Sequence, residues 1–431
     1  MKKIYIVSLG CPKNAADSER LGGVLEAAGF CLARTPDEAD VAVVNTCGFL
    51  QAAVEEGIQV ILELERLKKS GALRELAVVG CMLNRYGDEL KAEFPAVDYW
   101  ARSEEWDELL RVMGKNVPAA GGCLRAELNG TPWTRYLKIS EGCNSSCSYC
   151  AIPGIRGRLR SRPVAEIIEE AHKLVAEGAK ELCLVGQELS IYGQDLYGRP
   201  SLPLLLDELE KELPRGLWLR LFYLHPSLVD VKFLERVAAS PLIVPWLDIP
   251  IQHVDDDILR AMRRPPVEKH IRQLFKTGRE IDPDFAFRTT LMVGFPGETR
   301  AQFDKLLDFV EDIGFDRLGA FPYSPEDGTA AAAFPDQIPE EEKTARYNEL
   351  MELQQEVSTA RQARFVGREM DVLIDAVDEE TDERIGRTFR DAPEIDGEVL
   401  VSGASDAQPG EMIRVRITGS SEYDLSGEMI P

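Results

Sequence analysis

Short apolar strands alternate with helical segments through most of the first 320 residues, and this alternation constrains the fold more than any other feature. A strand that returns to its sheet through a helix lies parallel to its predecessor, with a right-handed crossover. The first three strands are expected at residues 3–9, 41–46 and 76–79, and the helices that follow them at residues 14–29, 50–69 and 83–91. Residues 1–120 are therefore predicted to form an open parallel α/β sheet.

The same alternation resumes at residue 132 and supplies about six more strand and helix units. Parallel units in this number predict a partial (β/α) barrel over residues 132–362, with its chemistry at the carboxyl ends of the strands. The segment 116–130 is rich in Gly, Pro, Ala and Asn, as is typical of a linker. From residue 365 to 431 short strands separated by Gly and Asp predict a small antiparallel β-barrel.

Three of the nine cysteines lie in one short loop, with the spacing C-x3-C-x2-C: Cys143, Cys147 and Cys150. Three thiolates from one loop can hold three irons of a cubane cluster, which leaves the fourth iron free to bind a ligand. A structural zinc site is the alternative, but it needs a fourth Cys or His nearby. None of the four histidines lies within about twenty residues of Cys150.

Three further cysteines each follow the last residue of an expected N-terminal strand: Cys11, Cys47 and Cys81. The carboxyl ends of parallel strands lie along one edge of a sheet, so these thiols could converge on one point. The alternative is that they are small buried residues. The remaining cysteines show no such pattern, and Cys183 lies in an apolar strand where burial explains it.

Polar or glycine-rich phrases follow several strands of the central domain, as a cofactor site at that edge would require. His253 could act as a base or could equally be a packed residue. A run of arginines follows the cysteine loop: Arg156, Arg158, Arg160 and Arg162. It is interpreted first as a solvated segment and second as a contact for an acidic substrate group. The residues of the phrases singled out for the cofactor are Gly186, Gln187, Glu188, Gln252, Gly294 and Gly297.

Composition limits the partners and the compartment. The net charge of −24 over 431 residues disfavours a grip on nucleic acid phosphates and favours a basic partner. No apolar run is long enough to span a membrane, and the first residues do not form a secretory signal. An odd number of cysteines without an export signal indicates reduced thiols, so a cytoplasmic location is expected.

The cysteine loop resembles the signature of the radical S-adenosylmethionine (SAM) superfamily, C-x3-C-x-aromatic-C, with Tyr149 at the aromatic position. The resemblance implies a 4Fe-4S cluster on Cys143, Cys147 and Cys150, whose open iron binds SAM, and a 5′-deoxyadenosyl radical made on reduction. It also implies that the strand-end phrases of the central domain, with Tyr149, contact SAM.

The whole chain resembles the methylthiotransferases of that superfamily. In that family three N-terminal cysteines hold a second 4Fe-4S cluster that carries the sulfur, and Cys11, Cys47 and Cys81 match them one by one. The last domain resembles the TRAM domain, usually an RNA-binding module. Residues 365–431, however, carry six arginines, no lysine and seventeen acidic side chains, a net charge of −11. Such a barrel suits a basic protein better than RNA.

One branch of this family methylthiolates the β-carbon of an aspartate in a highly basic small-subunit ribosomal protein, and the other modifies an adenosine in tRNA. The acidic tail and the phrases at residues 8–14 and 248–253 resemble the first branch. This implies as partners the ribosomal protein, alone or in the ribosome, an external electron donor and a sulfur donor. A tRNA methylthiotransferase and a non-catalytic iron-sulfur protein that docks on ribosomes are the alternatives.

Overall fold

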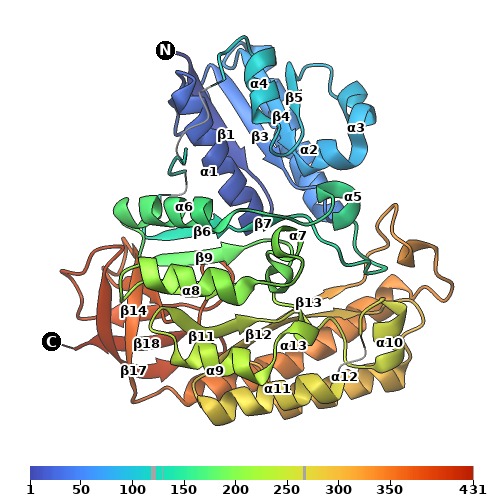
Figure 1. Ribbon diagram of the computed structural model, residues 1–431, viewed down its shortest axis with the longest axis vertical. Helices are drawn as coiled ribbons and strands as arrows, with labels where there is room; N and C mark the ends of the chain where they lie inside the picture. The colour runs from blue at the N-terminus through green and yellow to red at the C-terminus, as the bar shows by residue number, and fades with distance from the viewer. Residues whose placement is uncertain (118–122, 129, 266–267, 431) are drawn as a thin grey trace.

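The computed structural model describes residues 1–117, 123–128, 130–265 and 268–430. It contains two parallel sheets and a small barrel, in the order of the sequence (Figure 1). The N-terminal sheet lies at the top of the view, the central sheet below it, and the barrel at the lower left. Part of the expected linker at 116–130, residues 118–122 and 129, lies outside the described residues.

The N-terminal sheet has five parallel strands in the order β2-β1-β3-β4-β5. Its middle strand β3 (Val41–Thr46) is buried at all six positions, as expected for a strand covered on both faces. Apolar residues of α2 and α3 pack on one face, and those of α1 and α4 on the other. The other elements are β1 (Lys3–Ser8), β2 (Cys31–Leu32), β4 (Glu75–Gly80), β5 (Tyr99–Ala101), α1 (Pro12–Ala27), α2 (Gln51–Ser70), α3 (Cys81–Glu93) and α4 (Trp106–Val112).

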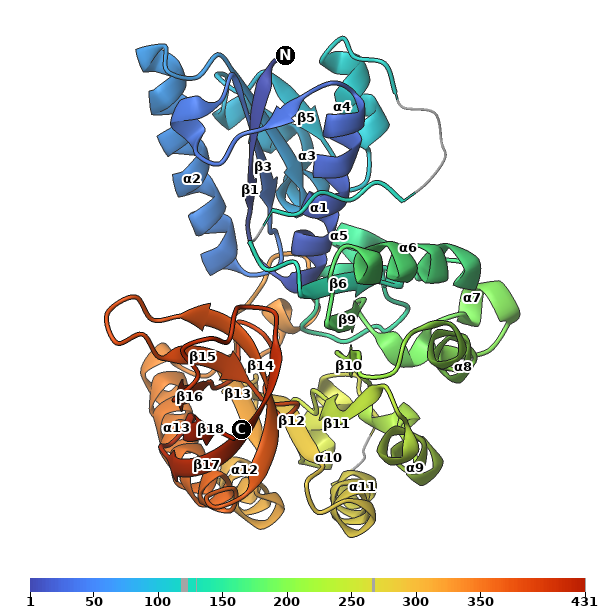
Figure 2. The ribbon, with the colours of Figure 1, turned by 90° about the vertical axis from the view of Figure 1, so that its left-hand side faces the viewer.

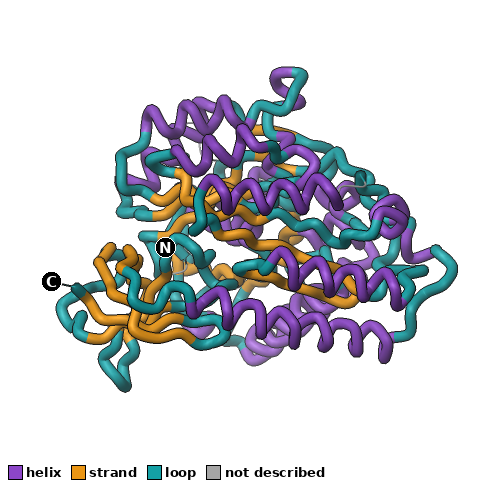
Figure 3. Tube along the Cα trace, turned by 90° about the horizontal axis from the view of Figure 1, so that it is seen from below, coloured by secondary structure: helices purple, strands orange, loops and turns teal. Residues whose placement is uncertain are grey.

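The central sheet has six parallel strands in sequence order, β6-β9-β10-β11-β12-β13, and confirms the predicted partial barrel. Helices cover its outer side (Figure 3). The strands are β6 (Thr134–Lys138), β9 (Glu181–Val185), β10 (Trp218–Leu221), β11 (Ile243–Asp248), β12 (Ala286–Val293) and β13 (Arg317–Pro322). The helices are α5 (Ile152–Arg156), α6 (Val164–Ala176), α7 (Gln194–Tyr197), α8 (Leu202–Glu212), α9 (Val231–Ala239), α10 (Asp256–Ala261), α11 (Glu268–Ile281), α12 (Arg300–Ile313) and α13 (Glu340–Ala363), with a short ribbon of β7 (Ser140–Glu141) and β8 (Arg160–Ser161).

Helix α11 illustrates how the sequence pattern produces this packing. Ile271, Leu274, Phe275 and Gly278 repeat at helical spacing and form its buried stripe. Gly278 lies flush against the ring of Phe287 in β12, where a methyl group would clash. Burying each large apolar side chain of this kind contributes about 1.5–3 kcal/mol.

Residues 369–429 form a closed barrel with the strand order β14-β15-β16-β18-β17. Four neighbouring pairs are antiparallel as predicted, but β16 and β18 pair in parallel. The sequence patterns did not predict β18, because its Ser, Gly and Glu residues have low strand propensity. The strands are β14 (Glu369–Val377), β15 (Arg384–Arg387), β16 (Val399–Ser402), β17 (Met412–Ser420) and β18 (Leu425–Met429).

The barrel lies beside β13 and α13 (Figure 2). Buried ion pairs fasten it to the central sheet. Arg390 of the barrel pairs with Asp316 at 3.1 Å, and Arg387 pairs with Glu181 at 2.9 Å. The amide of Gln362 in α13 donates to the carbonyl of Tyr423 at 2.6 Å. The barrel is therefore held by polar contacts as well as by the chain connection. Among the described helices, none combines the length and apolar character needed to cross a membrane.

Candidate functional site: a cavity between two sheet edges

A cavity of about 450 Å³ lies where the carboxyl ends of the two parallel sheets meet. Its lining comes from the turns after β1, β3 and β4 on one side. On the other side it comes from the loop after β7, from the turns after β9, β10, β11 and β13, and from Thr290 and Met292 of β12 itself. Six cysteines contribute to this lining: Cys11, Cys47, Cys81, Cys143, Cys147 and Cys150. The two sets predicted from the sequence thus face one space, as ligand sites at strand ends would require.

The N-terminal set converges because three turns pack against one another without intervening side chains. Cys11 precedes α1, Cys47 follows β3, and Cys81 is the first residue of α3. A methyl group at Gly10 would lie 2.6 Å from Cβ of Cys47, and one at Gly48 would lie 2.7 Å from the carbonyl oxygen of Cys81. Only glycine permits these approaches, and Gly10 also has a φ of +91°.

The chemistry of these thiols fits a metal cluster. All nine cysteines are free thiols. Burial raises the pKa of Cys81 to about 11 and also raises the pKa of Cys47. A buried thiolate needs positive charge nearby, which a bound iron-sulfur cluster supplies.

The central set occupies the loop after β7. The amide of Ser145 donates to Sγ of Cys143 at 3.3 Å, and its hydroxyl donates to Glu188 at 3.1 Å. Gly142 has a φ of +74° and packs against the carbonyl of Arg158, so a side chain there would clash. Backbone packing therefore shapes the loop that carries the three thiols.

Burial also raises pKa values in the Cys143, Cys147 and Cys150 set. It raises the pKa of Cys150 to about 12 and also raises the pKa of Cys143. These three thiols also line a second hollow of about 630 Å³, together with Arg158 and Arg263. The donor set suits a cluster with one iron free of protein ligands.

The residues predicted to contact SAM divide into two groups. Tyr149, Gln187, Glu188 and Gln252 line the cavity. Burial raises the pKa of Glu188, because its charged form loses water. Gln252 has a φ of +69°, which is unusual for a residue with a side chain, and its backbone is held by hydrogen bonds to Thr290 and Met292 of β12.

Gly186, Gly294 and Gly297 are not among the described residues that line the cavity. Gly186 allows close packing, because a methyl group there would lie 2.6 Å from the hydroxyl of Ser140. The amide of Gly294 donates to Glu298 at 2.7 Å, so its turn is bound to the protein's own carboxylate. Their role in binding SAM stays a prediction.

His253 is completely buried, and the structure favours the packing alternative for it. Its Nδ1 accepts a hydrogen bond from the amide of Asp255 at 3.0 Å. Burial lowers its pKa to about 4, so the ring is neutral at physiological pH.

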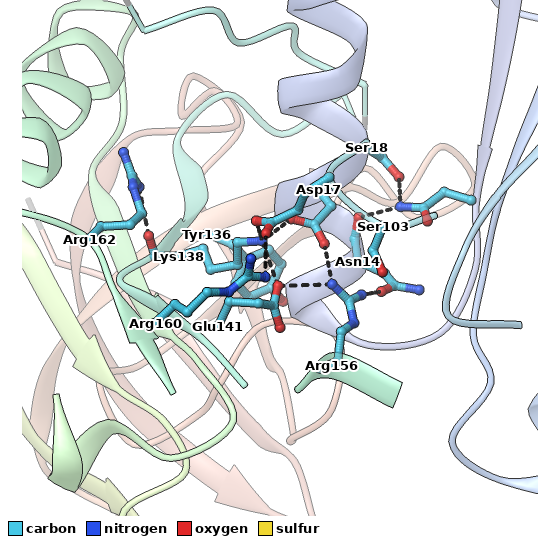
Figure 4. Close-up of polar contacts among 12 residues, drawn as sticks. Asn14, Asp17, Ser18, Ser103, Tyr136, Lys138, Glu141, Arg156, Arg160 and Arg162 are labelled. Atoms are coloured by element: carbon cyan, nitrogen blue, oxygen red, sulfur yellow. Dashed lines mark hydrogen bonds and ion pairs between the residues drawn. The ribbon is translucent and has the colours of Figure 1, made fainter. Parts of the chain in front are cut away.

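Arg156 is buried, and the interpretation of its arginine run as solvated is wrong at this position. It extends from α5 of the central domain to the N-terminal domain, where its Nε lies 3.0 Å from Sγ of Cys81. Its guanidinium also bonds to Asp17 at 3.0 Å, Glu141 at 2.9 Å and Asn14 at 2.6 Å (Figure 4). One side chain therefore links the two halves of the site.

Lys138 completes this network. Its ammonium bonds to Glu104 at 2.6 Å, to Glu141 at 2.9 Å and to Asp17. The three carboxylates lie close enough together to hold a cation, and the lysine already supplies that charge. Farther along the arginine run, Arg160 is exposed as expected.

Several lining residues were not singled out from the sequence: Lys13, Tyr223, His225 and Arg264. Lys13 follows Cys11 by two residues, so its place in the same turn was the available signal. Tyr223 and His225 follow β10, at the same sheet edge as the predicted phrases. No local pattern marks Arg264.

Sequence families match the three parts of the chain in turn. Residues 3–102 match the uncharacterized protein family UPF0004, residues 137–310 match the radical SAM superfamily, and residues 366–430 match the TRAM domain. Together with the parallel sheets and the cysteine-lined cavity, these matches define a radical SAM protein. Membership of that superfamily implies SAM and a 4Fe-4S cluster.

Curated relatives narrow the class. Several relatives are named ribosomal protein uS12 methylthiotransferase RimO. The one from Anaeromyxobacter sp. (strain Fw109-5) is 44% identical to this chain, and the match covers 99% of this chain and 93% of the relative. The protein of that name from Geobacter sulfurreducens is 43% identical, and the match covers 100% of this chain and 99% of the relative. The one from Aquifex aeolicus is also 43% identical, and the match covers 99% of this chain and 96% of the relative. The chain belongs to the RimO family of ribosomal protein uS12 methylthiotransferases.

Solved structures share the fold at low identity. The radical SAM methyltransferase TsrM from Kitasatospora setae is 15% identical, with a TM-score of 0.55, over 74% of this chain and 73% of that chain. The cobalamin-dependent radical SAM enzyme OxsB is 11% identical, with a TM-score of 0.52, and the match covers 80% of this chain and 56% of that chain. At such low identity, these structures support only the fold.

Proposed function

We propose that the chain adds a methylthio group to the β-carbon of an aspartate in ribosomal protein uS12, using SAM and two 4Fe-4S clusters. One observation carries the proposal: two sets of three cysteines, from two different sheets, line a single cavity. A reaction that joins a carbon radical to a sulfur atom needs both sources to face the same substrate.

The two sets have separate roles in this proposal. Cys143, Cys147 and Cys150 would hold the cluster that binds SAM, and the N-terminal set, Cys11, Cys47 and Cys81, would hold the second cluster. With SAM bound, the clusters supply radical generation and sulfur transfer. The protein's own residues position these groups, and Glu188, Gln187, Gln252 and Tyr149 are the polar and aromatic side chains available to SAM in the cavity.

The proposed domain boundaries follow these roles: residues 1–120 for the second cluster, 132–362 for radical chemistry and 365–431 for docking. The C-terminal barrel carries a net charge of −11, which suits the basic substrate protein. The chain would also need an external electron donor and a sulfur donor. A ribosomal substrate, free or assembled, is consistent with a cytoplasmic enzyme.

Mass spectrometry tests the proposal directly. The anaerobically reconstituted protein is incubated with SAM, reductant and either recombinant uS12 or tRNA, and both are analysed for an added methylthio group. We expect modification of an aspartate in uS12 and none of tRNA. Modification of tRNA alone would overturn the proposal in favour of the adenosine branch. Cluster binding without formation of 5′-deoxyadenosine would favour a non-catalytic protein.

A further inference from the structure

The positive charges of the cavity differ in whether the protein neutralises them. Arg156 pairs with Asp17 and Glu141. By contrast, Lys13 and Arg264 have no carboxylate within 4.0 Å among the described residues. The carboxylates of the lining are themselves occupied, since Glu188 accepts from Ser145 and Glu326 pairs with Arg85. The cavity therefore offers two cations to a bound anion.

The two free cations lie at opposite cysteine sets. Arg264 donates to the carbonyl of Pro250 at 2.9 Å and to the hydroxyl of Tyr149 at 3.5 Å, so it belongs to the Cys143–Cys150 side. Lys13 lies in the first turn of α1, two residues after Cys11. Each cysteine set thus has its own positive charge.

Lys13 is held in place without being neutralised. Its ammonium lies 3.7 Å from the ring centroid of Tyr223, at the end of β10 in the opposite sheet. Tyr223 is itself fixed, because its amide donates to Asp248 at 3.2 Å. A cation over an aromatic ring keeps its N–H donors available to an anion beside the ring.

We propose that Lys13 binds the side-chain carboxylate of the substrate aspartate and so sets its β-carbon beside the Cys11, Cys47 and Cys81 set. This inference rests on the proposed function and names a binding residue for it. The β-carbon is bonded directly to the carboxyl carbon, so an anchor on the carboxylate fixes the reacting carbon within one bond. Lys13 lies on the side of the cavity that would deliver sulfur.

The net charge of the protein explains why the substrate carboxylate needs a cation in the cavity. The acidic protein attracts a basic substrate as a whole but repels the one carboxylate that must enter the cavity. Moving a carboxylate out of water is costly unless a cation or hydrogen bonds replace its hydration. Lys13 supplies both a charge and donors, and an asparagine in the same place would gain far less from it.

The test compares uS12 carrying its target aspartate with uS12 carrying asparagine there, on wild type, Lys13→Met and Lys13→Arg. Binding is measured by fluorescence anisotropy, and iron content and SAM cleavage are measured in parallel. We expect wild type to bind the aspartate form about tenfold or more tightly than the asparagine form. Lys13→Met should remove this preference with iron content unchanged, and Lys13→Arg should largely restore it.

Lys115→Met is the matched control, because Lys115 also lies over an aromatic ring, that of Phe30 at 4.6 Å, but outside the cavity lining. It should leave the preference unchanged. Equal binding of both substrates by wild type would overturn the inference without any variant, as would a Lys13→Met protein that keeps the preference. A wild type that leaves uS12 unmodified would instead overturn the proposed function.

Discussion

The two cysteine sets reach one cavity by different routes. Cys143, Cys147 and Cys150 come from a single loop, so a few residues of local sequence bring them together. The other set, Cys11, Cys47 and Cys81, comes from three turns of a separate domain and is contacted by Arg156 of the central domain. The local set depends on one loop, whereas the dispersed set depends on the packing of a whole sheet and on the docking of two domains.

Removing each set should separate their functions completely. Replacing Cys11, Cys47 and Cys81 with alanine should remove about half of the iron and all methylthiolation, while SAM cleavage continues. Replacing Cys143, Cys147 and Cys150 should remove the other half and abolish SAM cleavage. Iron and sulfide assays with detection of 5′-deoxyadenosine measure both outcomes. A triple variant that kept all its iron would show that its set holds no cluster.

Arg156→Met should damage the dispersed set more than the local one. The change leaves Lys138 alone to neutralise Asp17 and Glu141, and it should cost up to the roughly 3–5 kcal/mol of a buried charge left without its partner. It also removes the hydrogen bond to Cys81. We expect a lower thermal midpoint and loss of iron from the dispersed set alone, resolved by the reduction potentials of the two clusters.

The control is Arg160→Met, in the same run but 68% exposed at its side chain. Surface ion pairs of this kind contribute about 1 kcal/mol or less, so stability and iron should change little. Equal losses in both variants would mean that the buried network does not hold the dispersed set.

Gly10→Ala tests close packing within the dispersed set. Gly10 and Gly29 have nearly the same φ, +91° and +89°, but only at Gly10 would a methyl group meet Cys47. Both substitutions bear a backbone cost of about 1–2 kcal/mol. Gly10→Ala should in addition reduce iron in the dispersed set. If Gly29→Ala reduces iron equally, backbone strain and not the contact with Cys47 is responsible.

Acid should weaken the contacts between the dispersed set's domain and the central domain by a smaller amount. Burial alone would raise the pKa of Asp17 and Glu170, but neighbouring cations, Lys138 and Arg125 first among them, lower both below their ordinary values of 3.8 and 4.5. Carboxylates with lowered pKa values stabilise the folded state fully above about pH 4.5 and lose this contribution as the pH falls toward the folded values. Thermal unfolding of the metal-free protein should therefore show a midpoint that falls with acid, and Asp17→Asn should flatten this dependence.

Local patterns were sufficient to predict both parallel sheets and the strand-end positions of Cys11, Cys47 and Cys81. Short apolar runs and helical spacing of apolar residues are visible in consecutive residues of the sequence. They did not predict the burial of Arg156, since two of its partners, Asp17 and Asn14, lie far away in sequence on α1. A charged run is usually solvated, and only the docking of two domains reverses that expectation here. Likewise, β18 forms because its neighbours β16 and β17 need a partner, and its own composition gives little indication of a strand.

The fastening of the C-terminal barrel has a consequence for which part of a substrate is modified. Arg387 and Arg390 clamp the barrel to Glu181 and Asp316, and Gln362 of α13 bonds to it as well. A protein docked as proposed on a barrel held in this way would lie at a fixed distance and orientation from the cavity. Among the aspartates of such a partner, only one at the matching distance from the docked surface could enter the cavity, so this geometry would select the target before any reaction occurs.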